Sequence, residues 1–204
     1  FGTEIFIVDP DNEYEKMCDA VGGAYVHLSL NSPTRINPFD LPSVVDSEEA
    51  DNALRGNLIT LHGLLRLMMG GAQAQVVGGT VTNANMLTPS EEADLDAALI
   101  ETYAKAGITN DPLTHRSTPP TIVDLYDTLL HMGGSGPSLA QRLRKYTTGT
   151  FSGIFSQQSN ININNPMAVF SIRDLEDELR PVAMYIVLNY IWNKTKVEKK
   201  KRIL

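Results

Sequence analysis

Cysteine is almost missing from this sequence, because Cys18 is the single cysteine in 204 residues. One cysteine excludes an internal disulfide and any cysteine-rich zinc site, and it favours a reducing compartment. Long apolar runs are missing too, since no stretch approaches the roughly 18 uninterrupted apolar residues that a membrane-spanning helix requires. The first residues lack the basic and then apolar pattern of a secretory signal. We therefore expect a folded, soluble protein that is neither exported nor inserted into a membrane.

Basic residues are in the minority, with 17 Lys and Arg against 24 Asp and Glu and a formal charge of -7. A broad nucleic-acid-binding face needs clustered Lys and Arg, so this balance argues against one. The one basic run, Lys196 to Arg202, is expected to be a solvated linker. The histidines are too scattered to give a paired metal-ligand spacing, so no metal site is expected at His27, His62, His115 or His131.

Apolar residues make up 42% of the chain, which is enough for a real core. Residues 4–8 form a short apolar run that ends at Asp9-Pro10, and this predicts a strand buried on both faces. Residues 12–21 predict a helix with one apolar face, and residues 24–28 alternate as a second strand. The expected face of that helix consists of Tyr14, Met17 and Val21. Strand, helix and strand within about thirty residues are typical of a βαβ unit.

Helical periodicity dominates the middle of the sequence. From residue 46 to residue 69, apolar residues recur every three or four positions. Two further helices are predicted from start signals at Thr88-Pro89 and Thr118-Pro119, and a shorter one carries Leu139, Leu143 and Tyr146. We interpret residues 44–146 as a separate all-α unit.

Strand patterns return after this unit. Residues 151–155, the alternating Ile161 and Ile163, and residues 167–172 each predict a strand. The acidic residues 174–178 are expected in the first turn of a helix whose apolar stretch, residues 182–192, is buried on most sides. Residues 201–204 predict the start of one more strand. The predicted fold class is thus α/β, with a mainly parallel sheet interrupted by an all-α helical insertion.

Four local strings resemble the VirB/TraC-type ATPases of type IV secretion and occur in the order of that family. Each is weak alone, and together they are specific. The resemblance covers both α/β parts and is weaker inside the helical insertion. The strings are Ile7 to Pro10 with Glu13-Tyr14, Arg35 to Asp40, Tyr146-Thr147 with Ser152 to Phe155, and Phe170 to Ile172 with Asp174 to Pro181.

The resemblance implies a RecA-like P-loop NTPase core, formed by residues 1–43 and 147–204, with residues 44–146 as the all-α insertion. It implies a hexamer in the cytoplasm, peripheral at the inner face of the cell membrane, that works with components of the secretion channel. The family uses ATP and Mg²⁺. In the family, the phosphate-binding loop precedes the position of Phe1, and the acidic magnesium ligands follow Leu204.

The phosphate-binding signature Gly-x-x-x-x-Gly-Lys-Ser/Thr does not occur in this sequence. The backbone cradle and the lysine for the β and γ phosphates are therefore missing. We expect this chain alone to bind no ATP tightly and to be inactive, and we expect ATP hydrolysis only in the full-length protein.

Two carboxylates stand where the first predicted strand ends, the edge at which open α/β sheets bind ligands. The resemblance suggests that Glu13 or Asp9 orients the attacking water. The alternative is structural: Asp9 caps the following helix, and Glu13 lies on its solvated first turn.

Hexameric motors place an arginine of one subunit against the γ-phosphate held by the next, because a guanidinium stabilises charge in the transition state. Arg35, Arg173 and Arg180 qualify by location. Each has an ordinary alternative, since Arg35 can pin its own loop and Arg173 or Arg180 can pair with the neighbouring acidic residues.

Two competing functions stay open. A double-stranded DNA translocase of the same RecA-like class would show DNA-stimulated ATP hydrolysis, although the acidic balance disfavours nucleic acid as a partner. A non-enzymatic helical interaction module on a degenerate α/β scaffold would lack a phosphate-binding loop in the parent gene.

Overall fold

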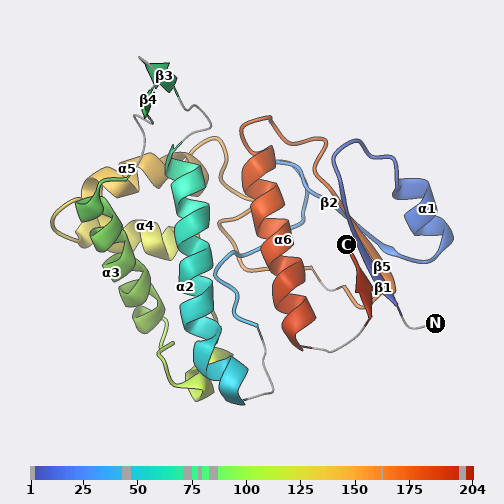
Figure 1. Cartoon of the computed structure of the whole chain (residues 1–204), viewed down its shortest axis with the longest axis horizontal. Coiled ribbons are helices and arrows are strands. Elements are labelled where there is room, and N and C mark those ends of the chain that lie inside the picture. The colour runs from blue at the N-terminus through green and yellow to red at the C-terminus, as the bar shows by residue number, and fades with distance from the viewer. Residues whose placement is uncertain are drawn as a thin grey trace.

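A four-stranded sheet forms one end of the molecule, and helices form the other (Figure 1). The computed structural model describes residues 3–42, 47–70, 75–77, 80–82, 87–161, 163–197 and 201–204. The strands of the sheet are β1 (Glu4–Asp9), β2 (Ala24–His27), β5 (Met167–Ser171) and β6 (Arg202–Ile203). They lie in the order β2-β5-β1-β6, and the three neighbouring pairs are parallel. The predicted α/β fold with a parallel sheet is confirmed.

Strand β5 lies at the centre of the sheet, between β1 and β2, and all five of its residues are buried. It pairs with β1 from Ile5 opposite Met167 to Asp9 opposite Ser171. A central parallel strand is covered on both faces, which explains its continuous apolar sequence. Residues that are far apart in the chain thus share one sheet, and β6 beside β1 confirms the strand expected at residues 201–204.

The short helix α1 (Glu15–Ala20) packs on one face of the sheet through Cys18, which contacts the β5 residues Met167 and Val169. The predicted apolar face of this helix was wrong, because its three residues are 39%, 47% and 54% exposed. The helix begins at residue 15 instead of residue 12, and its buried residue is Cys18. Gly23 follows the helix, where a Cβ atom would lie 2.6 Å from the sulfur of Cys18.

Helices occupy most of the region between β2 and β5, as the periodicity predicts. The capping box at Thr88 and Glu91 is present, whereas the next helix is capped by Thr121 with Asp124 instead of starting at Thr118-Pro119. Residues 44–46 lie outside the described residues, and the division of the chain into units stays a prediction. The elements are α2 (Ser47–Gly70), β3 (Gln75–Val77), β4 (Thr80–Thr82), α3 (Pro89–Lys105), the 3₁₀ helix η1 (Pro112–Arg116), α4 (Ile122–His131) and α5 (Gly136–Thr147).

The strand predicted at residues 151–155 is wrong. Ile161 and Ile163 belong to no strand either, and residue 162 between them lies outside the described residues. Residues 151–155 form turns, and Gly153 has a φ of 112°, which lies outside the range of a strand. Ile154 and Phe155 are fully buried, so their apolar character serves the core. The Ile154 carbonyl accepts a hydrogen bond of 3.2 Å from the Ile36 amide, which ties this turn to the Arg35–Asp40 segment.

Helix α6 (Arg180–Val197) lies between the sheet and the helical part and touches both β1 and α2 (Figure 1). The acidic residues 174–178 precede it, so their expected place in its first turn was wrong. The helix is also less buried than predicted. One face packs into the core, while Met184, Leu188 and Trp192 form an exposed stripe.

A buried turn at residues 37–40, in the segment after β2, forms hydrogen bonds with the helical part of the molecule. Within it, Phe39 is fully buried, and its carbonyl accepts a hydrogen bond of 2.8 Å from the Tyr103 hydroxyl of α3. The same hydroxyl accepts a hydrogen bond of 2.7 Å from the Asn57 amide of α2. The Asn37 side chain donates to the Pro120 carbonyl at 2.9 Å. These partners belong to α2, to α3 and to the segment before α4. The turn after β2 is therefore bonded to several helices of the molecule.

We expect Tyr103→Phe to lower the free energy of unfolding by about 1–3 kcal/mol, because the Phe39 carbonyl and the Asn57 amide lose their partner in a buried site. Urea unfolding measures this. The control is Tyr126→Phe, a partly buried tyrosine of α4, with an expected change within about 0.5 kcal/mol. Equal effects of the two substitutions would contradict the role of the Tyr103 hydroxyl.

Alkaline pH should destabilise the fold. Burial raises the pKa of Tyr103 above its ordinary value of 10.0, and it raises the pKa values of Tyr146, Tyr185 and Tyr190. Above pH 10.0 the unfolded chain therefore loses protons that the folded chain keeps. The free energy of unfolding should be unaffected by these groups below that pH and should fall above it. Unfolding curves across this range test the direction, and a rise in stability would contradict it.

Candidate functional site

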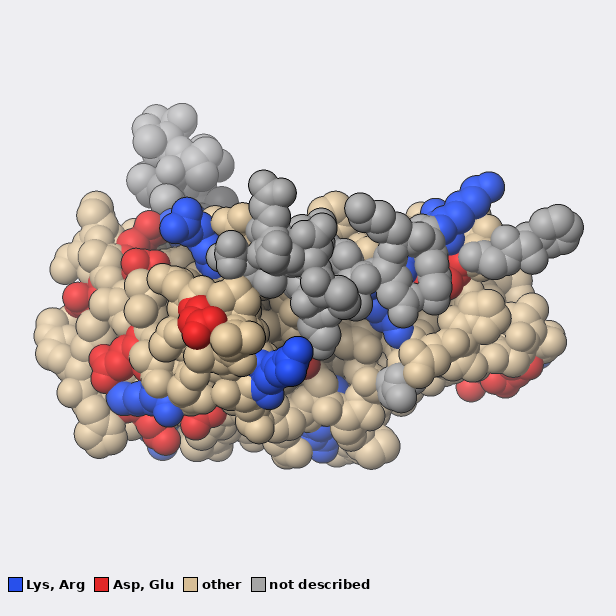
Figure 2. Space-filling model, turned by 90° about the horizontal axis from the view of Figure 1, so that it is seen from below, with Lys and Arg blue, Asp and Glu red and all other residues tan. Residues whose placement is uncertain are grey.

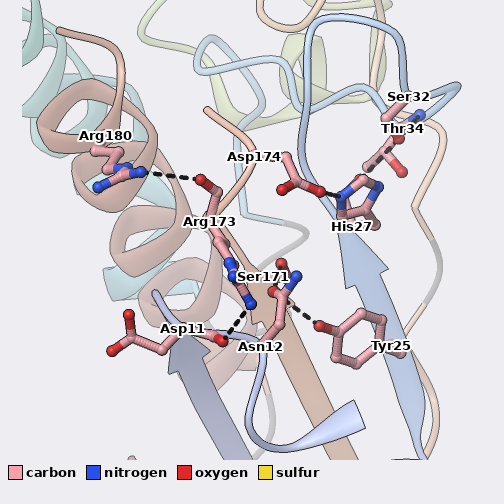
Figure 3. A network of polar contacts seen from close by, with 10 residues as sticks. All are labelled: Asp11, Asn12, Tyr25, His27, Ser32, Thr34, Ser171, Arg173, Asp174 and Arg180. Carbon is pink, nitrogen blue, oxygen red and sulfur yellow. Dashed lines mark hydrogen bonds and ion pairs between the residues drawn. The ribbon is translucent and has the colours of Figure 1, made fainter. Parts of the chain in front are cut away.

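The carboxyl ends of three neighbouring strands meet at one edge of the sheet. Asp9 ends β1, His27 ends β2, and both lie opposite Ser171 at the end of β5. Ligands of open α/β folds bind at this edge. Figure 3 shows the polar network there, which combines the loop after β1 with the segments after β2 and β5.

Asp9 is only 1% exposed, and its carboxylate accepts hydrogen bonds from three main-chain amides. The partners are the amides of Asp11 and Glu13, both at 3.2 Å, and that of Tyr14 at 3.1 Å. The structural alternative, in which Asp9 caps the following helix, is wrong, because the N-cap of α1 is Tyr14 and no side chain caps it. Asp9 instead organises the loop that leads to α1. Glu13 precedes α1 and so does not lie on its first turn. A direct role of Asp9 in catalysis stays a prediction.

Glu13 lies in the loop that Asp9 organises. Its main-chain amide is held by Asp9, while its side chain is exposed at the carboxyl edge of the sheet. Because the backbone is anchored, an exposed carboxylate at this point is presented to solvent from a defined position. The geometry is compatible with a group that orients a water molecule, and that role stays a prediction.

Asn12 connects the same loop to the two other strands. Its Oδ1 atom accepts a hydrogen bond of 3.1 Å from the Tyr25 hydroxyl and a short one from the Ser171 hydroxyl. Burial raises the pKa of Tyr25, and a hydrogen bond with Ser171 opposes this effect. Tyr25 therefore keeps its proton at neutral pH and can donate it. Single polar residues carry no motif, so sequence reasoning missed this cluster.

Arg173 and Arg180 are linked to each other and to the Asp9–Tyr14 loop (Figure 3). Arg173 is exposed and donates from Nη1 to the Asp11 carbonyl at 3.2 Å. Arg180 donates from Nη2 to the Arg173 carbonyl at 3.0 Å and forms an ion pair of 3.1 Å with Asp177. The structure thus brings Arg173 next to the loop of Glu13, while Arg180 supports the segment after β5.

Arg35 lies in the loop after β2 and is turned toward its own backbone. Its Nη1 donates to the Thr34 carbonyl at 2.8 Å and makes a short contact with the Ser32 carbonyl. Its amide and carbonyl are both bonded to Asn160. These contacts correspond to the structural alternative, in which Arg35 pins its own loop.

His27 and Asp174 form a close pair that sequence reasoning also missed, because it tested His27 only for metal spacing. The Nε2 atom of His27 lies 2.6 Å from an oxygen of Asp174. The His27 carbonyl accepts a hydrogen bond of 2.7 Å from the Ser32 hydroxyl. The segments after β2 and β5 are therefore joined directly at the carboxyl edge (Figure 3).

The surface charges are mixed. Figure 2 shows Lys and Arg dispersed among Asp and Glu on the face seen from below, without a continuous basic patch among the described residues visible there. Within the described ranges, each helix is too short or too polar to span a bilayer. The same ranges bring no three His, Cys, Asp or Glu side chains together as a metal site would need.

One of the comparisons with known proteins, that with solved structures, agrees with the sequence motifs. Comparisons with protein-family models and with curated proteins give no match. Among solved structures, VirB4 of Thermoanaerobacter pseudethanolicus is similar to this chain, with 25% sequence identity and a TM-score of 0.74. The match covers 95% of this chain and 69% of that protein chain. It confirms the predicted resemblance to the VirB/TraC-type ATPases and the predicted fold class.

We expect Asp9→Ala to lower the free energy of unfolding by about 2–4 kcal/mol, because three main-chain amides lose a charged acceptor. Asp9→Asn keeps one acceptor oxygen and should cost less. Chemical unfolding of the two variants measures the difference. A stability of Asp9→Ala equal to that of the unsubstituted chain would show that the carboxylate does not organise the loop.

Proposed function

We propose that this chain, a VirB4-type ATPase by its fold and its four sequence strings, is part of a motor that hydrolyses ATP to power type IV secretion or conjugative transfer. The observation that carries the proposal is the carboxyl edge of the sheet. There, an anchored loop presents Glu13, and the exposed Arg173 is bonded to Asp11 of the same loop, within a fold that matches VirB4 over 95% of the chain.

In this proposal, Glu13 orients the attacking water. ATP would supply the phosphoryl group and Mg²⁺ would neutralise charge on the phosphates. The signature of a phosphate-binding loop does not occur in the chain, so we place that loop and the magnesium ligands elsewhere in the full-length protein. In this proposal, the described residues contribute the carboxylate of Glu13 and the guanidinium of Arg173 at the carboxyl edge of the sheet.

Arg173 is our first candidate for the arginine that reaches the nucleotide of a neighbouring subunit. It is exposed, and its bond to the Asp11 carbonyl leaves it beside the loop of Glu13. Arg35 and Arg180 are second candidates, because their guanidinium groups bind carbonyl groups of their own segments. The proposal includes a hexamer that docks on a secretion channel at the cytoplasmic face of the membrane.

The alternative of a DNA translocase has less support, since the net charge is -7 and the visible basic residues are dispersed. Measuring ATP hydrolysis by the full-length protein with and without double-stranded DNA separates the two functions. Stimulation by DNA favours the translocase. A full-length protein without ATP hydrolysis favours the non-enzymatic interaction module.

We expect Glu13→Gln in the full-length protein to reduce ATP turnover at least about tenfold, because the amide cannot accept a proton from the attacking water. The matched control is Glu15→Gln, an exposed acidic residue two positions further on in α1, which should keep turnover within about twofold. Circular dichroism checks that both variants are folded. Unchanged turnover in Glu13→Gln would remove this residue from the site.

A further inference from the structure

The loop between β1 and α1 is held from more than one side. Asp9, at the end of β1, binds the amides of Asp11, Glu13 and Tyr14. This set of bonds is local and defines only the shape of the loop. A second set comes from β2, from β5 and from the segment after β5, and it defines where the loop lies above the sheet.

The second set converges on Asn12. Tyr25 of β2 and Ser171 of β5 both donate their hydroxyl protons to its Oδ1 atom. A carbonyl oxygen has two lone pairs, so these two donors use its full accepting capacity. Ser171 is fully buried, and Tyr25 lies on the neighbouring strand, so both donors belong to the rigid sheet.

The backbone of Asn12 adopts a left-handed conformation at this contact. Its φ is 59°, and it is the one residue other than glycine with a positive φ in the described part of the chain. Asparagine adopts this left-handed conformation more readily than most residues. The next residue is Glu13, whose own amide is bound by Asp9. The main chain of Glu13 is therefore fixed on one side by β1 and on the other by β2 and β5.

We propose that Asn12 is a positioning residue for Glu13. Its side chain is bonded to β2 and β5, and it thereby holds the loop so that the carboxylate of Glu13 lies where it can orient water. This inference rests on the proposed function of Glu13. Asn12 touches neither substrate nor water in this role and acts only through its neighbour. Arg173 supports the same loop through the Asp11 carbonyl, so the loop and the segment after β5 should move together.

The test uses the full-length ATPase and three substitutions. Asn12→Gly removes the acceptor and keeps the backbone, because glycine adopts a φ near 59° without strain. Asn12→Asp keeps the acceptor oxygen and is the conservative variant. Asn164→Gly is the matched control at an exposed position in the connection before β5. All assays are run below the melting temperature of every variant.

We expect Asn12→Gly to lower kcat about tenfold, because a carboxylate that is displaced by a fraction of an ångström orients water poorly. KM for ATP should stay within about twofold, since the loop does not hold the nucleotide. Asn12→Asp should retain most of kcat, and Asn164→Gly should match the unsubstituted protein. Full activity of Asn12→Gly, or a loss shared by Asn12→Asp, would overturn the inference.

A double-mutant cycle separates positioning from a general loss of stability. If Asn12 acts through Glu13, then adding Asn12→Gly to Glu13→Gln should cause no further loss of kcat. A purely structural role predicts that the two losses multiply, and that result would overturn the positioning role alone. Unchanged turnover in Glu13→Gln would instead overturn the proposed function of Glu13 and this inference with it.

Discussion

The structure depends on the pairing of β5 between β1 and β2. This strand follows β2 by about 140 residues of chain, and yet it supplies the centre of the sheet. Such a long insertion is tolerated because the entropic cost of closing a loop grows only slowly with its length. The pairing brings the ends of three strands to one edge. The candidate residues at this edge are neighbours because of this pairing.

The helical part packs against the sheet part through a shared hydrophobic core. One hydrophobic cluster runs from Phe6 of β1 through α6 to the helices between β2 and β5. The buried turn at Asn37 and Phe39 adds hydrogen bonds between these parts, and such bonds are costly to leave unmade in a dry interior. The helices and the sheet are therefore joined by packed side chains as well as by the chain itself.

Local sequence patterns were reliable where a single rule decided the structure. The apolar run of β5 and the capping box at Thr88 are examples, because burial on both faces and a free helix end each demand particular residues. The strand β1 also forms as predicted, but most of its residues are only partly buried. Local patterns gave a wrong secondary structure where tertiary contacts determined the conformation of the backbone. Phe155 carries the signature of a strand but fills the core from a turn, and α1 starts late because Asp9 holds the preceding residues.

The sequence by itself determined the fold class, the order of most elements, the resemblance to secretion ATPases and the positions of Asp9 and Glu13 at a strand end. Only the tertiary structure decided which polar groups meet there. Asn12 and Ser171 are separated by 159 positions, and no local periodicity relates them. Propensities and caps act over a few residues, whereas a hydrogen bond between strands exists only after the chain has brought those strands together.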